Sequence, residues 1–311
     1  MTTASASGKI ILFGEHAVVY GRPALAVPLG QLRAHARVVQ RTAPGVAIHA
    51  LDLDSTFSLD SAPAGDPLAA IVRLALEALR PDSPPALELE VWSDLPIAGG
   101  LGSGAAVSTA IVRALAAHLG KPLGPAQVSA LVYESEKLYH GTPSGIDNTV
   151  IAYEQAIRFE RATGPRPIRI ERPFLLAIAN TGIPSPTRIA VGDVRAGWQN
   201  DRVRFERLFD GVAEVVERAQ AALERGATGD LGPLMDRNQE LLQEIGVSSV
   251  EIERLAAEAR AAGAGGAKLS GGGRGGNVIA IVPRERAEMV REALLGAGAA
   301  STILTEISET G

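Results

Sequence analysis

The stretch LPIAGGLGSGAAVS, residues 95–108, lies between two regular patterns and decides how this chain is expected to fold. Before it, apolar and acidic residues alternate over residues 87–91, which is typical of a strand with one buried face. After it, Val107, Ile111, Leu115 and Leu119 recur every four residues and predict a helix that starts near Ser103. The glycine-rich stretch is therefore predicted to be a strand-to-helix loop.

Such a loop suits a phosphate group. Glycine lets backbone N–H groups approach an anion closely, and the start of the following helix adds a partial positive charge. The loop matches neither the Walker A pattern, since no Lys follows its last glycine, nor a GxGxxG spacing. A tight turn whose glycines serve only packing is the alternative.

Two further segments carry candidate chemistry. ESEKLYHGTPSGIDN (134–148) contains Glu136 and Asp147, which are candidates for binding a divalent metal and for handling a hydroxyl proton. KLSGGGRGGNVIAIV (268–282) is a second glycine-rich run, which suits the wall of a ligand site and equally a flexible connection. Lys9 begins an apolar run and either stabilises an alkoxide or is a surface charge. Each carboxylate, taken alone, is more often a solvated loop charge.

Composition excludes several classes of protein. The 311 residues suffice for two domains, and the net charge of −5 comes from acidic and basic residues that are interspersed, so we expect no nucleic-acid partner. The absence of cysteine excludes disulfides and thiolate chemistry. The N-terminal apolar run is too short for a signal peptide and no window approaches a membrane span, so we expect a cytoplasmic protein without a membrane partner.

Strands and helices are mixed along the chain. Short strands are predicted at 10–13, 24–27, 34–39 and 46–49, and helices at 66–80 and 126–138. A Gly, Pro and Arg-rich segment at 163–172 predicts a boundary between domains 1–168 and 169–311. Beyond it we expect a strand, two helices, a third helix capped by Ser248 and Glu251, and a final strand, helix and strand. This pattern favours α+β domains over a doubly wound sheet.

Three segments in fixed order resemble the motifs of the GHMP kinases, named for galactokinase, homoserine kinase, mevalonate kinase and phosphomevalonate kinase. They are GKIILFGEHAVVYG (8–21), LPIAGGLGSGAAVS (95–108) and AKLSGGGRGGNVIAIV (267–282). GEHAVVYG, HGTPSGIDN and NQELLQEIGVSS are similar to the mevalonate kinase branch in particular. The resemblance implies a two-domain GHMP kinase architecture, with an N-terminal domain like domain 2 of ribosomal protein S5 and a ferredoxin-like C-terminal domain.

The resemblance also implies an activity. It implies ATP and Mg²⁺ as cofactors, mevalonate as the small-molecule substrate, transfer to its 5-hydroxyl, and a role in isoprenoid precursor biosynthesis. A homodimer is expected because the family includes dimers. Within the family, a kinase for phosphomevalonate, homoserine or a sugar is the alternative. A non-catalytic, ligand-binding homologue is a further alternative, against which the retention of Lys9, Glu136 and Asp147 argues.

Carried over by position, the resemblance gives each candidate residue a role. Asp147 resembles the catalytic aspartate that accepts or orients the hydroxyl proton, and Lys9 would lower the pKa of that hydroxyl. Glu136 and Ser103 would hold the metal. The residues expected to bind ATP are Pro96, Gly99, Gly100, Leu101, Gly102, Ser103, Gly104 and Ala105. Those expected to bind the substrate are Glu15, His16, Ser144, Thr187, Gly271 and Gly272.

The chain departs from the family pattern at Gly104, where the motif GLGSSA has a second serine that helps to hold magnesium. Ser103 or water is expected to complete the metal's coordination in its place. The third motif has Arg274 where glycine is frequent and Asn277 where a small residue is common.

Overall fold

The computed structural model describes residues 1–63, 65–96, 99–140, 144–185 and 187–308. The chain forms two compact units that are not consecutive in sequence. Unit 1 comprises Met1–Lys9 and Leu29–Glu154, and unit 2 comprises Ile10–Pro28 and Gln155–Gly311. Strands β1 (Thr2–Phe13) and β2 (Ala24–Gln40) contribute residues to both. The division into domains 1–168 and 169–311 that the sequence predicts remains a prediction.

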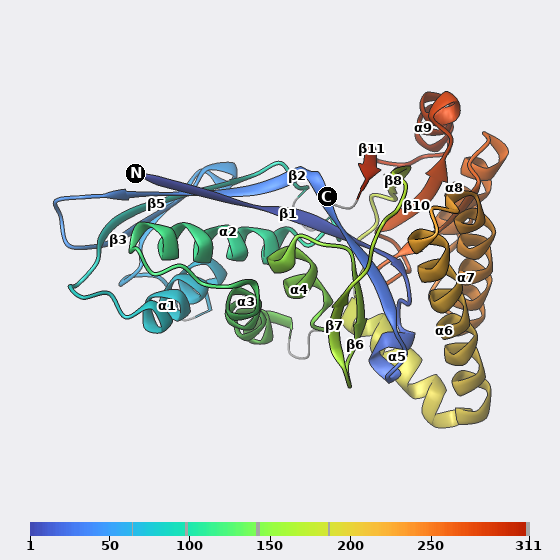
Figure 1. The fold of residues 1–311 in the computed structure, drawn as a ribbon, viewed down its shortest axis with the longest axis horizontal. Coiled ribbons are helices and arrows are strands. Elements are labelled where there is room, and N and C mark those ends of the chain that lie inside the picture. The colour runs from blue at the N-terminus through green and yellow to red at the C-terminus, as the bar shows by residue number, and fades with distance from the viewer. Residues whose placement is uncertain (64, 97–98, 141–143, 186, 309–311) are drawn as a thin grey trace. The chain divides into compact units, whose positions relative to one another are not determined.

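Unit 1 is a sheet with helices on one face (Figure 1). Its strands run in the order β4, β3, β5, β2, with β1 also paired to β2. The added strands are β3 (Gly45–Ala50), β4 (Ser55–Ser58) and β5 (Ala86–Ser93). β3 is parallel to β5, whereas β5 is antiparallel to β2. The alternation predicted for β5 is confirmed, because Leu87, Leu89 and Val91 are buried and the glutamates between them are half-buried.

Within the described residues, four α-helices belong to unit 1. They are α1 (Pro67–Leu79), α2 (Ser103–His118), α3 (Pro125–His140) and α4 (Ile146–Tyr153), with a 3-10 turn at Leu51–Leu53. The predicted N-cap of α1 is confirmed, since the Asp66 carboxylate accepts a hydrogen bond from the Ala69 N–H at 2.8 Å. The predicted start of α2 at Ser103 is also confirmed.

Unit 2 is built on a four-stranded antiparallel sheet in the order β11, β8, β10, β9. These strands are β8 (Phe174–Asn180), β9 (Gly266–Ser270), β10 (Asn277–Val282) and β11 (Ser301–Ile307). The first residues of β2 pair with β6 (Ile157–Glu160), and β6 pairs with β7 (Gly164–Pro167).

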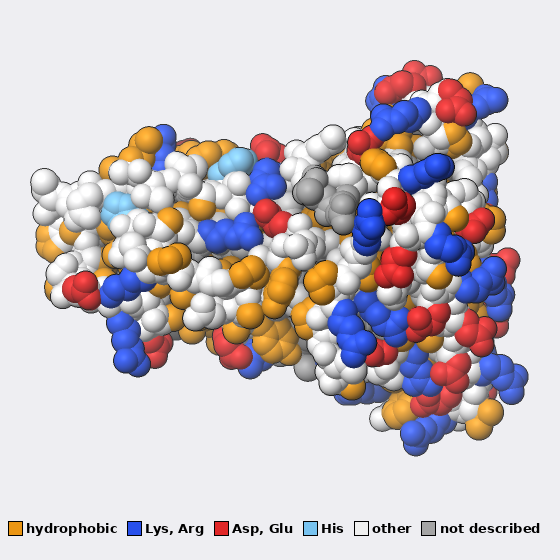
Figure 2. All heavy atoms as spheres, viewed as in Figure 1, with side chains coloured by type: hydrophobic (Ala, Val, Ile, Leu, Met, Phe, Trp, Pro, Cys, Tyr) orange, Lys and Arg blue, Asp and Glu red, His pale blue; other side chains and the backbone are white. Residues whose placement is uncertain are grey.

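The helices of unit 2 pack on this sheet or on one another. They are α5 (Thr187–Asn200), α6 (Arg202–Glu224), α7 (Leu231–Ile245), α8 (Val250–Ala261) and α9 (Ala287–Gly296), with 3-10 turns at Ala17–Tyr20, Thr228–Asp230 and Arg284–Arg286. Acidic and basic side chains are interspersed over the face of these helices in Figure 2, as the sequence predicts. Among the residues described, every helix is too short or too polar to cross a bilayer.

Two expectations for secondary structure were wrong, and two helices were missed. The strands predicted at 24–27 and 34–39 are one strand, β2, because Pro28 and Gly30 do not interrupt it. The helices α4 and α5 were not predicted. The N-cap of α8 is Ser249 and not Ser248, since the Ser249 hydroxyl accepts from the Ile252 N–H.

Candidate functional site

The glycine-rich loop precedes α2 as predicted, and its backbone is shaped by Gly102. Gly102 is the N-cap of α2 and has a φ of 77°, a left-handed conformation that favours glycine. A Cβ atom here would lie 2.9 Å from Ile151 Cδ1 and 3.1 Å from Lys9 Cγ, so a side chain would crowd both and require them to shift. Among the described residues no side chain caps this end of α2, so the first N–H groups of the helix are suited to bind an anion.

The other predicted members of this loop differ in exposure. Leu101 is 2% exposed and anchors the loop in the core, whereas Pro96, Gly100 and Gly104 are exposed. A Cβ atom added to Gly104 would meet no atom within 4 Å. Residues 97 and 98 lie outside the described part of the chain. The loop is thus anchored in the core by Leu101 and open to solvent at Gly104, as a ligand-binding surface requires.

Lys9 is fastened to this loop at two points. Its backbone N–H donates to the Leu101 carbonyl at 2.9 Å, and its ammonium donates to the Gly100 carbonyl at 3.3 Å. Lys9 is far from this loop in sequence, yet it places its ammonium group beside the loop. The Lys9 side chain is only 6% exposed.

Asp147 completes a pair with this lysine. Lys9 Nζ lies 3.0 Å from Asp147 Oδ2, and the aspartate side chain is 31% exposed. Asp147 stands in the first turn of α4, whose N-cap is Gly145 with a φ of 88°. The Ser144 hydroxyl accepts from the Ile146 N–H at 3.3 Å, so it supports the start of α4. The predicted pair of a lysine and an acidic residue is thus brought together beside the loop.

Glu136, on α3, belongs to the same electrostatic cluster. Burial, and secondly the negative charge of Asp147, raise the pKa of Glu136 to about 8, and the charge of Lys9 opposes them. A cation near Glu136 would favour its ionised form. The described residues hold no group of three acidic, histidine or cysteine side chains that would bind a metal by themselves.

A second set of predicted residues meets within unit 2. His16 Nε2 donates to the Gly272 carbonyl at 3.0 Å, which identifies the Nε2–H tautomer. Burial lowers the pKa of His16 to about 4, with the hydrogen bond to Gly272 opposing and the charge of Arg274 adding to the effect. His16 is therefore neutral at pH 7.

Gly272 also approaches Thr187 closely. A Cβ atom on Gly272 would lie 2.7 Å from Thr187 Oγ1 and 3.1 Å from Ser185 Oγ. The Ser185 hydroxyl donates to the Gly273 carbonyl at 2.7 Å. Gly271 has a φ of 96° and space around it. The second glycine-rich run is therefore held against the segment that leads into α5, and it is not a loose connection.

Glu15 has a partner that the sequence did not predict. Lys268 Nζ lies 2.5 Å from Glu15 Oε1, and the two side chains are 0% and 1% exposed. Burial lowers the pKa of Lys268, and the charge of Glu15 opposes this. Arg274 was also unassigned, and its guanidinium pairs with Asp193 of α5.

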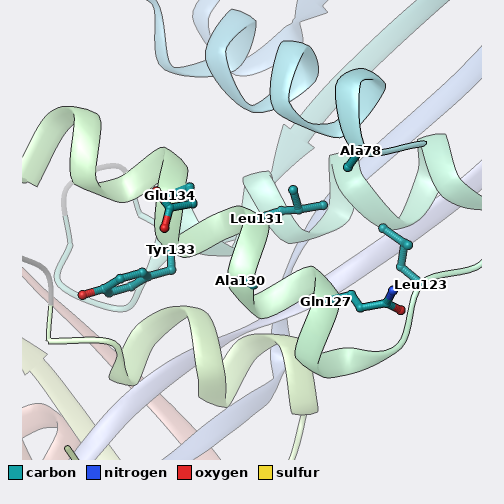
Figure 3. A pocket seen from close by; sticks show the side chains of 7 residues that line it. All are labelled: Ala78, Leu123, Gln127, Ala130, Leu131, Tyr133 and Glu134. Atoms are coloured by element: carbon teal, nitrogen blue, oxygen red, sulfur yellow. The ribbon is translucent and has the colours of Figure 1, made fainter. Parts of the chain in front are cut away.

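A pocket elsewhere in unit 1 is not part of this cluster. It has a volume of about 400 Å³. Figure 3 shows its lining, which is formed by Ala78, Leu123, Gln127, Ala130, Leu131, Tyr133 and Glu134. None of these is a predicted site residue.

Comparisons with known proteins match the whole chain. Residues 69–155 match the family model of the GHMP kinases N terminal domain, and residues 219–300 match that of GHMP kinases C terminal. The chain is 32% identical to a mevalonate kinase of Thermococcus gammatolerans, over 99% of this chain and 96% of that protein. It is 33% identical to a mevalonate kinase of Methanothermobacter thermautotrophicus, over 91% and 90% of the two chains.

A solved structure agrees with these matches. The crystal structure of L. major mevalonate kinase in complex with R-mevalonate superposes with a TM-score of 0.86 at 28% identity, and covers 100% of this chain and 97% of that one.

Proposed function

We propose, from the premise that the chain belongs to the mevalonate kinase family of the GHMP kinases, that it transfers the γ-phosphoryl group of ATP to the 5-hydroxyl of mevalonate. The predicted two-domain GHMP kinase fold is confirmed by the same matches. Among the site's features, the ion pair of Lys9 and Asp147 beside the glycine-rich loop supports this reaction best. The product is 5-phosphomevalonate, a precursor in isoprenoid biosynthesis.

Asp147 and Lys9 are proposed as the catalytic residues. The hydroxyl oxygen forms a bond to the γ-phosphorus while the bond from that phosphorus to the bridging oxygen of ADP breaks. The Asp147 carboxylate takes or orients the hydroxyl proton. Lys9 has three N–H donors, of which the described contacts engage two, with Asp147 and the Gly100 carbonyl. The third can stabilise the alkoxide that develops.

The start of α2 is proposed to hold the phosphates. Backbone N–H groups from the loop through Ala105 and the partial positive charge of the helix would bind the anion, with Gly99 and Gly102 leaving room for it. Phosphoryl transfer depends mainly on such positioning and charge neutralisation.

Glu136 and Ser103 are proposed as the protein ligands of Mg²⁺. Magnesium prefers oxygen donors and commonly takes one or two carboxylates together with substrate phosphates, which fits the one carboxylate and one hydroxyl proposed here. When bound, the ion would neutralise charge on the phosphates. The hydroxyl of Ser103, at the first position of α2, would add a neutral oxygen.

Gly104 offers a test of this metal site. Because an added side chain meets open space, Gly104→Ser should fold normally and supply the hydroxyl that the family motif has at this position. We expect the Mg²⁺ concentration that gives half-maximal activity to fall several-fold, with Gly104→Ala as the control. An unchanged magnesium requirement in Gly104→Ser would show that the glycine at this position does not affect metal binding.

Glu15, His16, Ser144, Thr187, Gly271 and Gly272 are proposed to bind the substrate. His16, neutral at pH 7 and donating from Nε2 to Gly272, keeps Nδ1 as an acceptor that suits a hydroxyl group. Because the His16 imidazole is neutral, it would bind a hydroxyl group of the substrate and not pair with the substrate's carboxylate.

An assay of ADP release tests the proposal. Purified protein with ATP, Mg²⁺ and R-mevalonate should release ADP, and the product should carry one phosphate ester on the primary alcohol by ³¹P NMR. Phosphomevalonate, homoserine and galactose serve as competing acceptors. Release of ADP with one of these and none with mevalonate would assign another substrate, and release with none would contradict the kinase activity.

A further inference from the structure

Glu154 adopts an uncommon backbone conformation directly after α4. It is the C-cap of the helix, with φ and ψ of 48° and 40°, and its N–H donates to the Val150 carbonyl at 2.8 Å. This left-handed position is usually glycine or asparagine, since other residues adopt it at an energetic cost. A glutamate here therefore indicates that its side chain makes compensating contacts.

Those contacts converge on one oxygen. Glu154 Oε1 accepts from the Ser7 N–H at 3.0 Å, from Arg33 Nη2 at 2.7 Å and from Arg113 Nη1 at 3.1 Å. The three donors come from β1, β2 and α2. A single carboxylate thus joins the end of α4 to three other elements of unit 1.

The two arginines extend these connections. Arg113 donates from Nη1 to the Ser5 carbonyl at 2.8 Å and from Nη2 to the Ala152 carbonyl at 2.9 Å. Arg33 donates from Nε to the Ser5 hydroxyl at 3.0 Å. We call Ser5, Ser7, Arg33, Arg113 and Glu154 the Glu154 clamp.

Three of the four elements that the clamp joins, β1, α4 and α2, also carry residues of the proposed site. Lys9 lies two residues after Ser7 on β1, Asp147 lies in the first turn of α4, and α2 begins at the glycine-rich loop. The clamp therefore fastens the far end of α4 and α2 to the strand that supplies the lysine. Any slip of α4 along β1 would change the contact between Lys9 and Asp147.

The clamp contributes more to geometry than to stability. The side chains of Glu154, Arg33 and Arg113 are 30%, 30% and 26% exposed, and partly exposed ion pairs stabilise a fold only modestly. A displacement of about 1 Å at a reacting group, by contrast, can reduce a rate by about 100-fold.

We propose that Glu154 is a positioning residue, which sets the Lys9–Asp147 geometry by tying the end of α4 to β1. This inference rests on the proposed function of that pair. Glu154→Gln keeps the size of the side chain but removes the charge that holds both arginines. We expect kcat to fall about 10 to 100-fold, with KM for ATP and mevalonate within about 2-fold of the parent.

Glu90→Gln is the matched control. Glu90 forms a half-buried ion pair with Arg37 in the same unit, but both residues belong to the sheet and neither contacts Glu154. Its kcat should stay within about 2-fold of the parent. An unchanged kcat in Glu154→Gln, or an equal loss in Glu90→Gln, would overturn the proposal.

Hydrogen exchange gives a readout that needs no turnover. Amides in residues 2–9 and 146–153 should exchange faster in Glu154→Gln than in the parent, and no faster in Glu90→Gln. If the parent phosphorylates none of the acceptors, the proposed function fails, whereas the exchange pattern still tests the clamp. Unchanged exchange in both segments would overturn the clamp even in an active enzyme.

Arg33→Lys covers the possibility that Glu154→Gln does not fold. A lysine keeps the charge but cannot reach both the Ser5 hydroxyl and the Glu154 carboxylate, so a smaller loss of kcat with unchanged KM is expected. A parental kcat in Arg33→Lys, in the absence of folded Glu154→Gln, would overturn the proposal.

Discussion

Lys9 Nζ lies 3.0 Å from Asp147 Oδ2, and the lysine is far less exposed than the aspartate. The ammonium is also held by the Gly100 carbonyl, so its position is fixed from two sides. The aspartate, with 31% of its side chain exposed, remains accessible to a ligand. This asymmetry suits a pair in which the lysine is preorganised and the carboxylate exchanges a proton.

Asp147→Asn should abolish most turnover while leaving nucleotide binding intact. Asparagine keeps the shape of the side chain but takes up no proton, so we expect kcat to fall about 10² to 10⁴-fold. Calorimetric titration with a non-hydrolysable ATP analogue should give an affinity within about 2-fold of the parent.

The control for this variant is Asp82→Asn, which removes an exposed carboxylate paired with Lys121 in the same unit. It should be fully active. Parental turnover in Asp147→Asn would remove Asp147 from the mechanism.

Gly102→Ala should be far more damaging than Gly104→Ala, although the two glycines are separated by one residue. The new methyl group at 102 crowds Ile151 and Lys9 and requires a left-handed backbone, whereas at 104 it enters open space. We expect at least about 100-fold lower kcat for Gly102→Ala, because the lysine must move, and less than about 3-fold for Gly104→Ala. Equal effects of the two variants would contradict this role for Gly102.

The sequence predicted the parts of the site that depend on local pattern. The loop at 95–108 lies between a strand whose alternating burial is confirmed and a helix in which Ile111 and Leu115 of the predicted pattern are buried, whereas Val107 and Leu119 are half-buried. The N-cap at Asp66 was equally predictable from the sequence, since Pro67 follows it directly. These features are encoded within a few neighbouring residues.

Features that depend on tertiary contacts were not predictable. Helix α4 has only eight residues and follows a polar run, so its periodicity is too short to recognise. Helix α5 buries only Ala190 and Val194, which leaves almost no apolar pattern. Ser248 and Ser249 both have suitable hydroxyls, and the choice between them depends on Glu253, to which Ser248 donates at 2.6 Å.

The stability of unit 2 should fall as the pH is lowered from about 6.5 to about 4 because of His16. The folded-state pKa of His16, about 4, lies below its unfolded value of 6.5, so the unfolded chain binds the proton preferentially in this window. The stabilisation is complete above the unfolded pKa, and its loss at pH 4 amounts to about 3 kcal/mol by linkage.

His16→Gln isolates this contribution. Its amide can donate to the Gly272 carbonyl but does not titrate, so the variant should lose less stability than the parent over the same window. Urea unfolding at several pH values measures the difference, in which the other titrating groups cancel. Parallel pH profiles for the two proteins would contradict the lowered pKa.

Lys268→Met should destabilise unit 2 strongly. The substitution removes the ammonium that lies 2.5 Å from Glu15 Oε1 and leaves that carboxylate fully buried without its lysine. Breaking a buried pair from one side typically costs about 3 to 5 kcal/mol. Lys121→Met, which breaks an exposed pair, should cost less than about 1 kcal/mol.

A double variant tests whether the two buried side chains stabilise each other. In Glu15→Gln/Lys268→Met no charge of this pair remains, so its loss in the free energy of unfolding should be smaller than the sum of the losses in Glu15→Gln and Lys268→Met. Urea unfolding of the parent, Lys268→Met, Glu15→Gln, the double variant and Lys121→Met measures these values, and additive single losses would show that the two side chains do not stabilise each other.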